Sequence, residues 1–418
     1  MLFGSSGIRQ PFGQPLLSLG PLVGAAVAQD TNHVILATDA RTSRNILAEA
    51  ILSGLLAGGA RISFGGIAPT PAVALAARDA GAGIMITASH NPEAYNGYKL
   101  FRPDGSSYTL AQQEEIERRI TAPSWAAWDK QGSVSAADLN TPHKETILHD
   151  IDIPEAITVI VDCANGAGGR VTPDALASNG AKIIPVNCDP SGKFGRPSEP
   201  LEKNLLHLPK LMKASGASCA VVNNGDADRM MAFDNRGRYV DGDQLLMLFA
   251  KYLDAKQVVT TVDASMAIED VAEVHRTPVG DSFVSEELIS WGTFGGEPSG
   301  SWVFPKHSLC PDGPYAAALF MQMSAEWDVA AELDALPKYT ILRDSVMTEC
   351  GKAILASLGA ENATDGIRVA DETGWYLIRA SGTEPKVRCT AEGKTKEDAK
   401  RMLETGMAVL KKAQKEVN

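Results

Sequence analysis

The stretch GIMITASHNPEAYNGYKLF, residues 83–101, decides how the N-terminal part of the chain folds. The run from Gly83 to Ile86 is apolar and predicts a buried strand, and Asn91-Pro92 prevents that strand from continuing smoothly. Ser89 therefore follows the end of a core strand. Open α/β sheets place their sites at such strand ends, so this serine is a candidate nucleophile or the cap of a turn. No GxSxG motif surrounds it, which disfavours an esterase.

Outward from this stretch, apolar strand-like runs alternate with helical patterns. Strand patterns over 33–39 and 61–67 flank a helical pattern over 46–59, and another helical pattern begins at Thr70. This βαβ alternation predicts a parallel or mixed sheet with helices on its faces. The regularity is lost over 121–150, and the alternation restarts near residue 157 and again near residue 242.

The C-terminal part has a different pattern. GIRVAD and GWYLIRAS predict antiparallel strands, and an amphipathic helix is predicted over 396–417. We therefore predict an α/β fold with three similar α/β domains that contain mixed sheets, plus a smaller C-terminal α+β domain. The predicted domain ranges are 1–140, 141–240, 241–338 and 339–418.

The composition excludes some classes of protein. The chain has 418 residues and a formal net charge of −12, which disfavours a nucleic-acid-binding surface. None of its six cysteines has CxxC spacing, so we expect free thiols. We recognise no signal peptide and no apolar run of about 18 residues, so we expect a cytoplasmic protein without a membrane partner.

Two further polar loops follow predicted strands. In NNGDADR, Asp226 and Asp228 alternate and Arg229 follows. Alternating oxygen ligands suit a hard cation such as Mg²⁺, although an Asx turn would use the same residue type. In GGEPSG, Glu297 and Ser299 are flanked by glycines. These two side chains can hydrogen-bond sugar hydroxyls, or they can belong to an ordinary surface turn.

A third loop, IRASGTEPKVR at 378–388, has the chemistry of a phosphate site. Its polar and glycine positions are Arg379, Ser381, Gly382, Thr383 and Arg388. Backbone N–H groups, hydroxyls and arginine forks bind a phosphate dianion, although the spacing is not that of a P-loop. A separate polar cluster near the N-terminal sheet comprises Arg9, Arg41, Ser43 and Arg44.

These motifs occur together and in one order. TASHNPEAYNGYK, NGDADR, GGEPSG and RASGTEPKVR, with FGSSGIR and TPVGDSFV, resemble the α-D-phosphohexomutase superfamily over essentially the whole chain. The chain is most similar to the archaeal phosphoglucosamine mutase branch of that superfamily. The resemblance implies four domains around a central cleft, which in chain order carry the phosphoserine, bind the metal, bind the sugar and bind the phosphate.

The resemblance also implies the activity and the roles of residues. A phosphohexomutase interconverts hexose 1-phosphate and 6-phosphate through a phosphoserine and a 1,6-bisphosphate intermediate. The implied catalytic residues are Ser89, Lys99, Arg9, His90 and Arg229, with Lys99 the candidate general acid/base. The implied ligands of one Mg²⁺ per chain are Ser89, Asn224, Asp226 and Asp228. The implied sugar-binding residues are Glu297, Ser299, Thr277 and Gly280, and the implied phosphate-binding residues are Arg379, Ser381, Gly382, Thr383 and Arg388. Hexose phosphates are the implied small-molecule partners, glucose or glucosamine 1,6-bisphosphate is the implied activator, and monomer or homodimer stays open.

Three positions depart from the superfamily's motifs. Asn224 stands where DGDADR begins with aspartate. Ser301 stands where GExSGH has its histidine, and His307 is the nearest candidate to replace it. Arg196, in GRPSEP, stands near the histidine of HxPNP.

Glucosamine phosphate is the leading candidate substrate. The first alternative is phosphoglucomutase/phosphomannomutase activity. An alternative of another class is a catalytically weak, regulatory homologue that binds sugar phosphates, which Asn224 and the missing histidine would explain. A simple sugar phosphatase is a third alternative.

Overall fold

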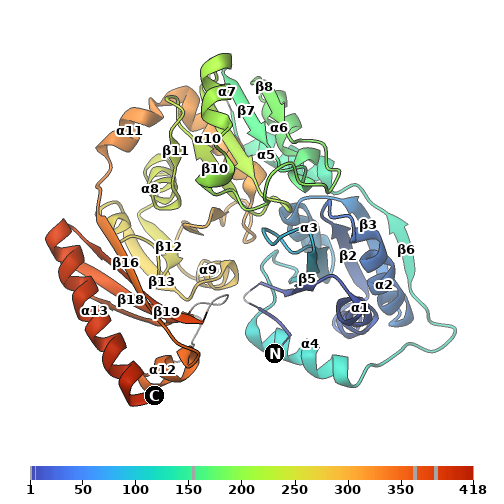
Figure 1. The fold of residues 1–418 in the computed structure, drawn as a ribbon. Helices are drawn as coiled ribbons and strands as arrows, with labels where there is room; N and C mark the ends of the chain where they lie inside the picture. Colours follow the sequence, from blue (N-terminus) through green and yellow to red (C-terminus); the bar gives the residue numbers. More distant parts are fainter. Residues whose placement is uncertain (1, 5, 153–155, 361–364, 381–384, 418) are drawn as a thin grey trace.

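The N-terminal unit is built around the strand that contains Ile84. The structure, a computed structural model, describes residues 2–4, 6–152, 156–360, 365–380 and 385–417. Four sheets follow one another along the chain in a curved arrangement, and both termini lie on the same side (Figure 1). The predicted fold class of three α/β units and a smaller C-terminal unit is confirmed.

The first unit is a six-stranded mixed sheet in the order β1-β5-β4-β2-β3-β6. Its strands are β1 (Ile8–Pro11), β2 (His33–Thr38), β3 (Arg61–Ile67), β4 (Ala82–Ile86), β5 (Tyr95–Phe101) and β6 (Ser133–Ala136). Its helices are α1 (Gln14–Val27), α2 (Arg44–Ala57), α3 (Thr70–Ala76), η1 (Ala77–Asp79) and α4 (Leu110–Thr121). Helices α1, α2 and α4 cover one face of the sheet and α3 covers the other. All five residues of β4 are buried, as expected for a central strand covered on both faces.

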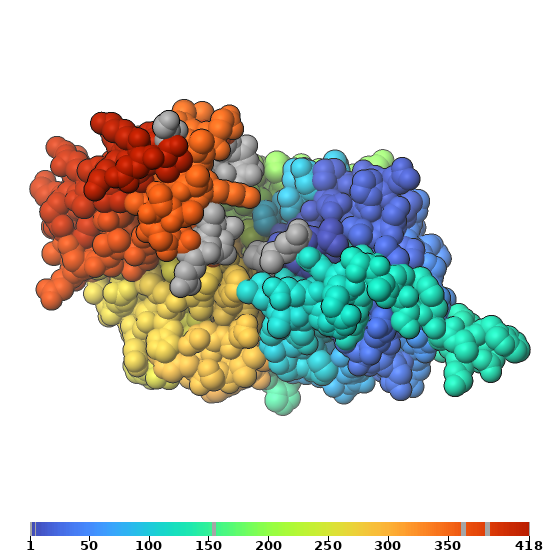
Figure 2. Space-filling model, turned by 90° about the horizontal axis from the view of Figure 1, so that it is seen from below, coloured from blue at the N-terminus to red at the C-terminus, as the bar shows by residue number. Residues whose placement is uncertain are grey.

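One segment differs from the sequence-based prediction. The stretch over 121–150, where the alternation was expected to be lost, contains β6, which pairs in parallel with β3 at the edge of the first sheet, and the helix α5 (Asn140–Asp150). β6 has four residues and all of them are exposed, so its sequence pattern is too short and too weakly apolar to identify a buried strand. Residues around 122–132 stand out from the first unit (Figure 2), and Trp128 in this segment is 89% exposed.

The second unit has a five-stranded sheet in the order β11-β10-β9-β7-β8. Its strands are β7 (Thr158–Asp162), β8 (Lys182–Val186), β9 (Cys219–Asn223), β10 (Met230–Phe233) and β11 (Tyr239–Val240). Its helices are α5 (Asn140–Asp150), η2 (Ala167–Arg170), α6 (Thr172–Ser178), η3 (Glu202–Asn204) and α7 (Leu208–Ser215). Strands β7, β8 and β9 are parallel and β10 reverses direction, so the loop between β9 and β10 lies at the carboxyl end of β9.

The third unit has a four-stranded sheet in the order β13-β12-β14-β15. Its strands are β12 (Gln257–Thr261), β13 (Glu273–Thr277), β14 (Phe294–Glu297) and β15 (Ser301–Val303). Its helices are α8 (Gly242–Tyr252), η4 (Met266–Asp270), α9 (Asp281–Glu287), α10 (Gly313–Glu326) and α11 (Val329–Ala335).

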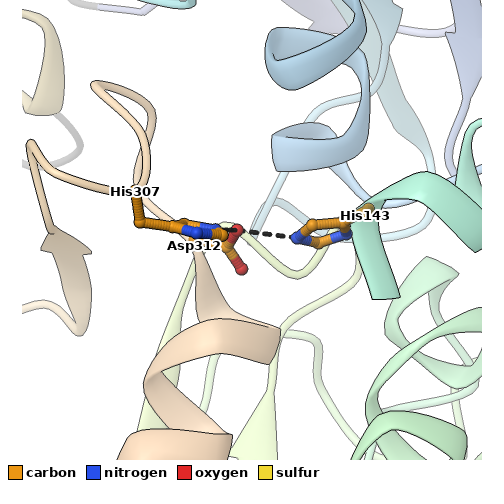
Figure 3. Close-up of side chains that lie close together, drawn as sticks. All are labelled: His143, His307 and Asp312. Atoms are coloured by element: carbon orange, nitrogen blue, oxygen red, sulfur yellow. Dashed lines mark hydrogen bonds and ion pairs between the residues drawn. The ribbon is translucent and has the colours of Figure 1, made fainter. Parts of the chain in front are cut away.

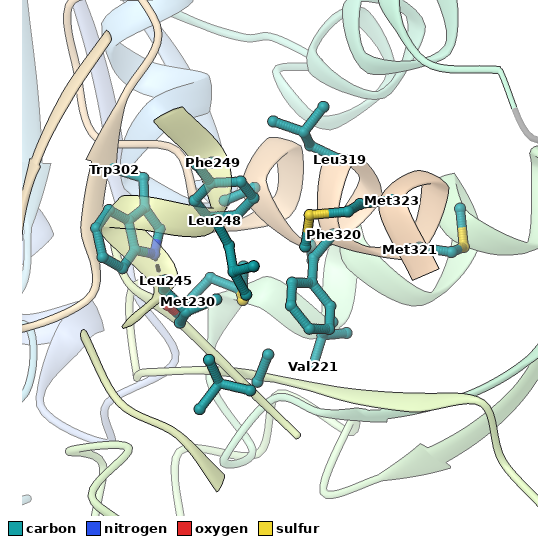
Figure 4. Close-up of a cluster of buried hydrophobic side chains, with 14 of the residues drawn as sticks. Val221, Met230, Leu245, Leu248, Phe249, Trp302, Leu319, Phe320, Met321 and Met323 are labelled. Carbon is teal, nitrogen blue, oxygen red and sulfur yellow. Dashed lines mark hydrogen bonds between the residues drawn. The ribbon is translucent and has the colours of Figure 1, made fainter. Parts of the chain in front are cut away.

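The second and third units share one hydrophobic core. Helix α10 follows the third sheet in sequence but packs against β9 and β10 of the second. Figure 4 shows Val221 and Met230 of the second sheet together with Phe249, Trp302 and residues of α10. The Trp302 indole N–H donates to the Met230 carbonyl oxygen at 2.7 Å. A boundary between residues 240 and 241 therefore divides the sequence without dividing the core.

The fourth unit is an antiparallel sheet in the order β16-β19-β18-β17. Its strands are β16 (Thr340–Met347), β17 (Ile367–Ala370), β18 (Gly374–Ala380) and β19 (Lys386–Gly393), and its helices are α12 (Gly351–Ser357) and α13 (Lys396–Val417). A buried carboxylate joins this unit to the third. Glu392 accepts hydrogen bonds from the Trp375 indole and the Met266 N–H, both at 2.7 Å, and from the Ser265 hydroxyl at 2.6 Å.

Candidate active site

Strands β4 and β5 position Ser89 and Lys99. The two strands are antiparallel neighbours, and Met85 of β4 is paired with Lys99 of β5. Ser89 lies three residues beyond the end of β4, and both Ser89 and Lys99 are buried. Ser89 has a φ of 51°, a left-handed conformation that a serine adopts only when its surroundings hold it there. The chain therefore places the Ser89 hydroxyl in a fixed position just beyond the carboxyl end of the central strand β4.

Arg41 holds the loop that carries Ser89. Sequence analysis placed this arginine in a polar cluster without a role, whereas in the structure it is 1% exposed and lies under the serine loop. Its guanidinium donates to Asp39 Oδ2 at 3.0 Å and to the carbonyl oxygens of Ser89 at 2.8 Å, Asn91 at 2.7 Å, Pro92 at 2.6 Å and Tyr95 at 2.9 Å. The fork of donors thus fixes the backbone on both sides of His90.

The loop between β9 and β10 brings two carboxylates to Ser89. The Ser89 hydroxyl lies 3.2 Å from both carboxylate oxygens of Asp228. Asp226 accepts a hydrogen bond from the Thr70 hydroxyl at 2.7 Å, which ties this loop to the first unit. The four residues predicted as one metal site, Ser89, Asn224, Asp226 and Asp228, therefore lie together.

The Asn224 amide is turned so that its nitrogen faces the carboxylates. Its Nδ2 donates to Ser89 Oγ at 3.1 Å, Asp226 Oδ1 at 3.0 Å and Asp228 Oδ1 at 2.7 Å. Its Oδ1 accepts from the Arg229 backbone N–H at 3.1 Å. In this orientation the amide supplies donors, not an oxygen ligand, to the centre of the loop.

Lys99 lies between the two aspartates. Its ammonium donates to Asp226 Oδ2 at 3.2 Å and to Asp228 Oδ2. Burial acts to lower the pKa of Lys99, but the Asp226 and Asp228 carboxylates outweigh it and hold that pKa above its ordinary value. Lys99 is therefore a charged donor that balances the carboxylates in this state.

The residues fit a hard divalent cation in part. Ser89, Asp226 and Asp228 offer the oxygen donors that Mg²⁺ prefers, and the two carboxylates together carry one more negative charge than Lys99 offsets. Asn224 would add an oxygen only if its amide turned over and released the Arg229 N–H.

A cavity of about 250 Å³ lies beside Ser89, between the first three units. Its lining residues are Ser6, Arg9, His90, Asp228, Arg229, Thr261, Asp263, Val279, Gly280, Asp281, Glu297, Pro298, Ser299 and Ser301. Among the residues that the structure describes, none of the fourth unit lines it.

Basic side chains on the wall near Ser89 have unused donors. Within the described part of the chain, Arg9 Nε and Arg229 Nε are buried donors without a hydrogen-bond partner, and His90 Nδ1 is a buried ring nitrogen without one. Burial, with the Arg229 and Arg9 charges, holds the pKa of His90 far below its ordinary value, so the ring is neutral. Buried donors without partners are uncommon in folded proteins, and an anionic ligand in the cavity would satisfy them.

Carboxylates and hydroxyls line the opposite wall. Glu297, at the end of β14, accepts from the Gly280 N–H at 2.7 Å and from the Ser299 hydroxyl at 3.0 Å. Thr277 ends β13, is buried, and donates its hydroxyl to the Pro278 carbonyl oxygen. The four predicted sugar-binding residues thus come from adjoining segments, and three of them line the cavity.

Glu297 is expected to make the free energy of unfolding fall as the pH rises. Burial and the Asp281 carboxylate raise the pKa of Glu297 from 4.5 to about 7. Between pH 4.5 and about 7, Glu297 of the folded protein keeps a proton that the unfolded chain has released. The free energy of unfolding therefore falls as the pH rises through this range. Urea unfolding at a series of pH values measures the decline, and Glu297→Gln should remove about 3 kcal/mol of it.

Asp243 provides the comparison for this experiment. Burial raises the pKa of Asp243 to about 7, so this carboxyl contributes a decline of the same sign. Asp243→Asn should remove the part of the pH-dependent decline in stability that Asp243 causes, and it should leave the part that Glu297 causes. An unchanged pH dependence in Glu297→Gln would contradict the assignment.

Two arginines of the predicted phosphate loop face each other across a strand pair. Arg379 of β18 and Arg388 of β19 are direct register partners, and Arg379 lies 3.6 Å from Asp263, which lines the cavity. Cross-strand partners extend from the same face of a sheet, and arginine side chains on one face are suited to binding a phosphate. The other predicted members, Ser381, Gly382 and Thr383, lie outside the described residues.

Comparison with known proteins assigns the family. Models described as phosphoglucomutase/phosphomannomutase match the chain in four parts: alpha/beta/alpha domain I over residues 1–127, domain II over 145–237, domain III over 241–361 and the C-terminal domain over 344–407. The chain belongs to this family.

Relatives of similar length support the assignment to the phosphoglucomutase/phosphomannomutase family. The chain is 39% identical over 430 residues to a probable phosphoglucosamine mutase of Methanocella arvoryzae, covering 98% of each chain. It is 38% identical over 442 residues to a phosphoglucosamine mutase of Methanococcus maripaludis, again covering 98% of each. A crystal structure of a phosphoglucomutase/phosphomannomutase family protein from Burkholderia thailandensis superposes with a TM-score of 0.87 at 25% identity, covering 99% of this chain and 97% of that one.

The structure locates two departures from the motifs of the phosphohexomutases. His307 does not replace the missing sugar-loop histidine, because it is buried against Asp312 and His143, away from the cavity lining (Figure 3). Asp312 Oδ2 lies 2.7 Å from His143 Nε2 and 3.0 Å from His307 Nε2. This cluster joins α5 to the start of α10. At the position of the missing histidine, Ser301 lines the cavity.

Arg196 has a structural role below the loop that bears the aspartates. Its guanidinium donates to both Asp162 carboxylate oxygens at 3.1 Å and to the Asn223 carbonyl oxygen at 2.7 Å. Asn223 immediately precedes Asn224, so Arg196 supports the entry into the loop.

Proposed function

We propose that this chain is a phosphohexomutase that moves a phosphoryl group between O1 and O6 of a hexose, with glucosamine phosphate as the preferred substrate. The observation that carries the proposal is the fixed Ser89 hydroxyl, 3.2 Å from the Asp228 carboxylate and beside a cavity with unused basic donors. The choice of glucosamine rests on relatives with 38–39% identity that are named phosphoglucosamine mutases.

Ser89 is proposed as the carrier of the phosphoryl group. A hydroxyl of the bound monophosphate attacks the phosphorus of phosphorylated Ser89 and gives up its proton. The bond from phosphorus to Ser89 Oγ breaks, Ser89 Oγ takes up a proton, and a 1,6-bisphosphate forms. After the bisphosphate turns over, Ser89 Oγ takes the other phosphoryl group and the product monophosphate leaves. Arg9, Arg229 and neutral His90 line the cavity and are proposed to donate to the oxygens of the transferring phosphoryl group. Lys99 offsets the negative charge of Asp226 and Asp228. A sugar 1,6-bisphosphate is the proposed activator, because it can phosphorylate Ser89.

Ser89, Asp226 and Asp228 would hold one Mg²⁺, with Asn224 as a weaker fourth member. When bound, Mg²⁺ neutralises charge on the transferring phosphoryl group. Glu297, Ser299, Gly280 and Thr277 are proposed to hold the sugar hydroxyls. The pair Arg379 and Arg388, with the loop of Ser381, Gly382 and Thr383, is proposed to hold the phosphate that is not reacting.

Asn224→Asp is expected to tighten Mg²⁺ binding about tenfold, because it replaces amide donors that face Asp226 and Asp228 with a charged oxygen ligand. Titration calorimetry at fixed pH and ionic strength measures the affinity. Asn179→Asp is the matched control, since it adds the same charge at the end of α6. Equal affinities of Asn224→Asp and the parent protein would contradict the account of this loop.

The remaining parts of the proposal concern the organisation of the molecule. We place the functional domains at 1–140, 141–240, 241–338 and 339–418. The protein is proposed to act in the cytoplasm on small-molecule hexose phosphates, as a monomer or homodimer and without nucleic-acid or membrane partners. No helix in the described ranges has the length and apolarity needed to cross a membrane.

A competition experiment tests the substrate. The protein is mixed with Mg²⁺, a trace of sugar 1,6-bisphosphate and the 1-phosphates of glucosamine, glucose and mannose, and phosphorus NMR follows each signal. Fastest conversion of the glucosamine compound to its 6-phosphate is the expected result. Faster conversion of glucose or mannose phosphate would assign the alternative phosphoglucomutase/phosphomannomutase activity. No conversion would favour a sugar-phosphate-binding protein, and release of inorganic phosphate alone would favour a phosphatase.

A further inference from the structure

Two cysteines of the second unit lie close together. Cys163 directly follows β7 and Cys188 lies two residues beyond β8, and these parallel strands are paired up to Asp162 and Val186. The two sulfur atoms are 3.6 Å apart. Cys163 is buried and Cys188 is partly exposed. Their separation is set by neighbouring strands of one sheet, so it belongs to the rigid part of the fold.

Both cysteines adjoin the turn that supports the aspartate loop. Ala164 and Asn165, which follow Cys163, have φ values of 52° and 54°. The next two residues contact the aspartate loop, because the Ala167 N–H donates to the Gly225 carbonyl oxygen at 2.8 Å and Gly166 packs on the Gly225 backbone.

Cys188 contacts the same turn from the other side. A Cβ atom on Gly169 would lie 2.0 Å from the Cys188 carbonyl oxygen, so the two backbones touch. Both cysteines thus contact the turn that packs on Gly225, which lies between Asn224 and Asp226.

We propose that Cys163 and Cys188 form a reversible disulfide when the protein meets a small-molecule disulfide oxidant, and that this bond weakens Mg²⁺ binding by displacing the aspartate loop. A disulfide needs a sulfur–sulfur distance of about 2.05 Å, so the sulfur atoms must approach each other from 3.6 Å. Both cysteines lie beyond the ends of their strands, and the movement is proposed for the turn that follows Cys163.

The chemistry proceeds by thiol–disulfide exchange. The Cys188 thiolate attacks the oxidant, the sulfur–sulfur bond of the oxidant breaks, and one reagent thiol leaves. The Cys163 sulfur then attacks the mixed disulfide, the bond between the two cysteines forms, and the second reagent thiol leaves. Each cysteine gives up one proton, and the two electrons reduce the oxidant to two thiols. Contact with Cys163 lowers the pKa of the Cys188 thiol, whereas contact with Cys188 and burial raise the pKa of Cys163, which suits this order of attack.

Mass spectrometry in glutathione redox buffers tests the bond. The protein carries Cys350→Ser, because Cys350 is exposed and would form disulfides between molecules. The expected result is a linked peptide pair that contains Cys163 and Cys188, with the loss of two free thiols per chain and full reversal by dithiothreitol. A stable glutathione adduct on Cys188, or two unreacted thiols in oxidising buffer, would overturn the proposal.

Calorimetry on the same samples tests the effect on the metal loop. Oxidation should weaken Mg²⁺ affinity several-fold, and Cys188→Ser and Cys163→Ala should both remove this redox dependence. Cys219→Ser is the matched control, because Cys219 is buried in β9 of the same sheet and should leave the redox dependence intact. Equal Mg²⁺ affinity of the linked and reduced proteins would overturn the second half of the proposal.

The effect on Mg²⁺ rests on the proposed function, whereas formation of the disulfide does not. A reduced protein that fails to bind Mg²⁺ counts against the proposed function, and linked peptides in that same sample would still support the disulfide.

Discussion

The Ser89→Ala variant is expected to lose phosphohexomutase turnover by at least about 10⁴-fold, because it removes the only group proposed to carry the phosphoryl intermediate. The fold should survive, since the change removes one hydroxyl whose contacts are the Asp228 carboxylate and the Asn224 amide. Intact-mass measurement adds a second readout, since the parent protein should carry a phosphoryl adduct after incubation with a sugar 1,6-bisphosphate and the variant should not.

Ser106→Ala is the matched control for that variant. Both serines are 1% exposed, and Ser106 hydrogen-bonds Arg102 and Asp104 outside the residues that line the cavity. The control should keep both the adduct and the turnover. A Ser89→Ala protein that retained turnover within tenfold of the parent would contradict the assignment of Ser89.

Replacing Arg41 with methionine is expected to lower the free energy of unfolding by about 3–5 kcal/mol, because it removes the charge paired with the buried Asp39 carboxylate and the side chain that donates to four carbonyl oxygens. Burial already raises the pKa of Asp39 to about 6 against the opposing effect of Arg41, so loss of the guanidinium raises it further. Urea unfolding measures the loss. Turnover should fall as well, because the guanidinium fixes the backbone at Ser89.

Two further variants test whether Arg41 acts through its charge or through the geometry of its guanidinium group. Arg41→Lys keeps the charge but not the planar fork, so it should restore only a small part of the stability. Arg44→Met is the matched control, since Arg44 is partly exposed and, among the described residues, its side chain donates only to the Ala40 and Arg41 carbonyl oxygens. It should change stability by less than about 0.5 kcal/mol. An Arg41→Met protein as stable as Arg44→Met would contradict the role of Arg41 in stabilising the loop that carries Ser89.

Much of the fold could be predicted because its patterns are local. The continuous apolar run of β4 and the alternation with α2 and α3 follow from residue type and period. The same holds for Ser89, Asp226 and Asp228, each of which follows a buried strand. The structure places Ser89 3.2 Å from Asp228, and the Asn224 amide donates to all three side chains.

Other features depend on contacts that a sequence pattern does not contain. Arg41 resembles any basic residue of a polar loop until the carbonyl oxygens around Ser89 are seen to converge on it. His307 lies six residues after Ser301 in sequence, but the Asp312 carboxylate draws it away from the cavity. Helix α10 crosses to the second sheet because its apolar faces complete a core begun by β9 and β10.

Transfer of the phosphoryl group between Ser89 and a sugar tests the central claim most directly. The protein is phosphorylated with a sugar 1,6-bisphosphate, freed of small molecules, and mixed with glucosamine 1-phosphate and Mg²⁺, and peptide mapping and phosphorus NMR then follow the phosphoryl group. The account predicts that the Ser89 phosphopeptide disappears as glucosamine 1,6-bisphosphate forms in equal amount. A phosphopeptide at another residue, or loss of the group from Ser89 only as inorganic phosphate, would contradict it.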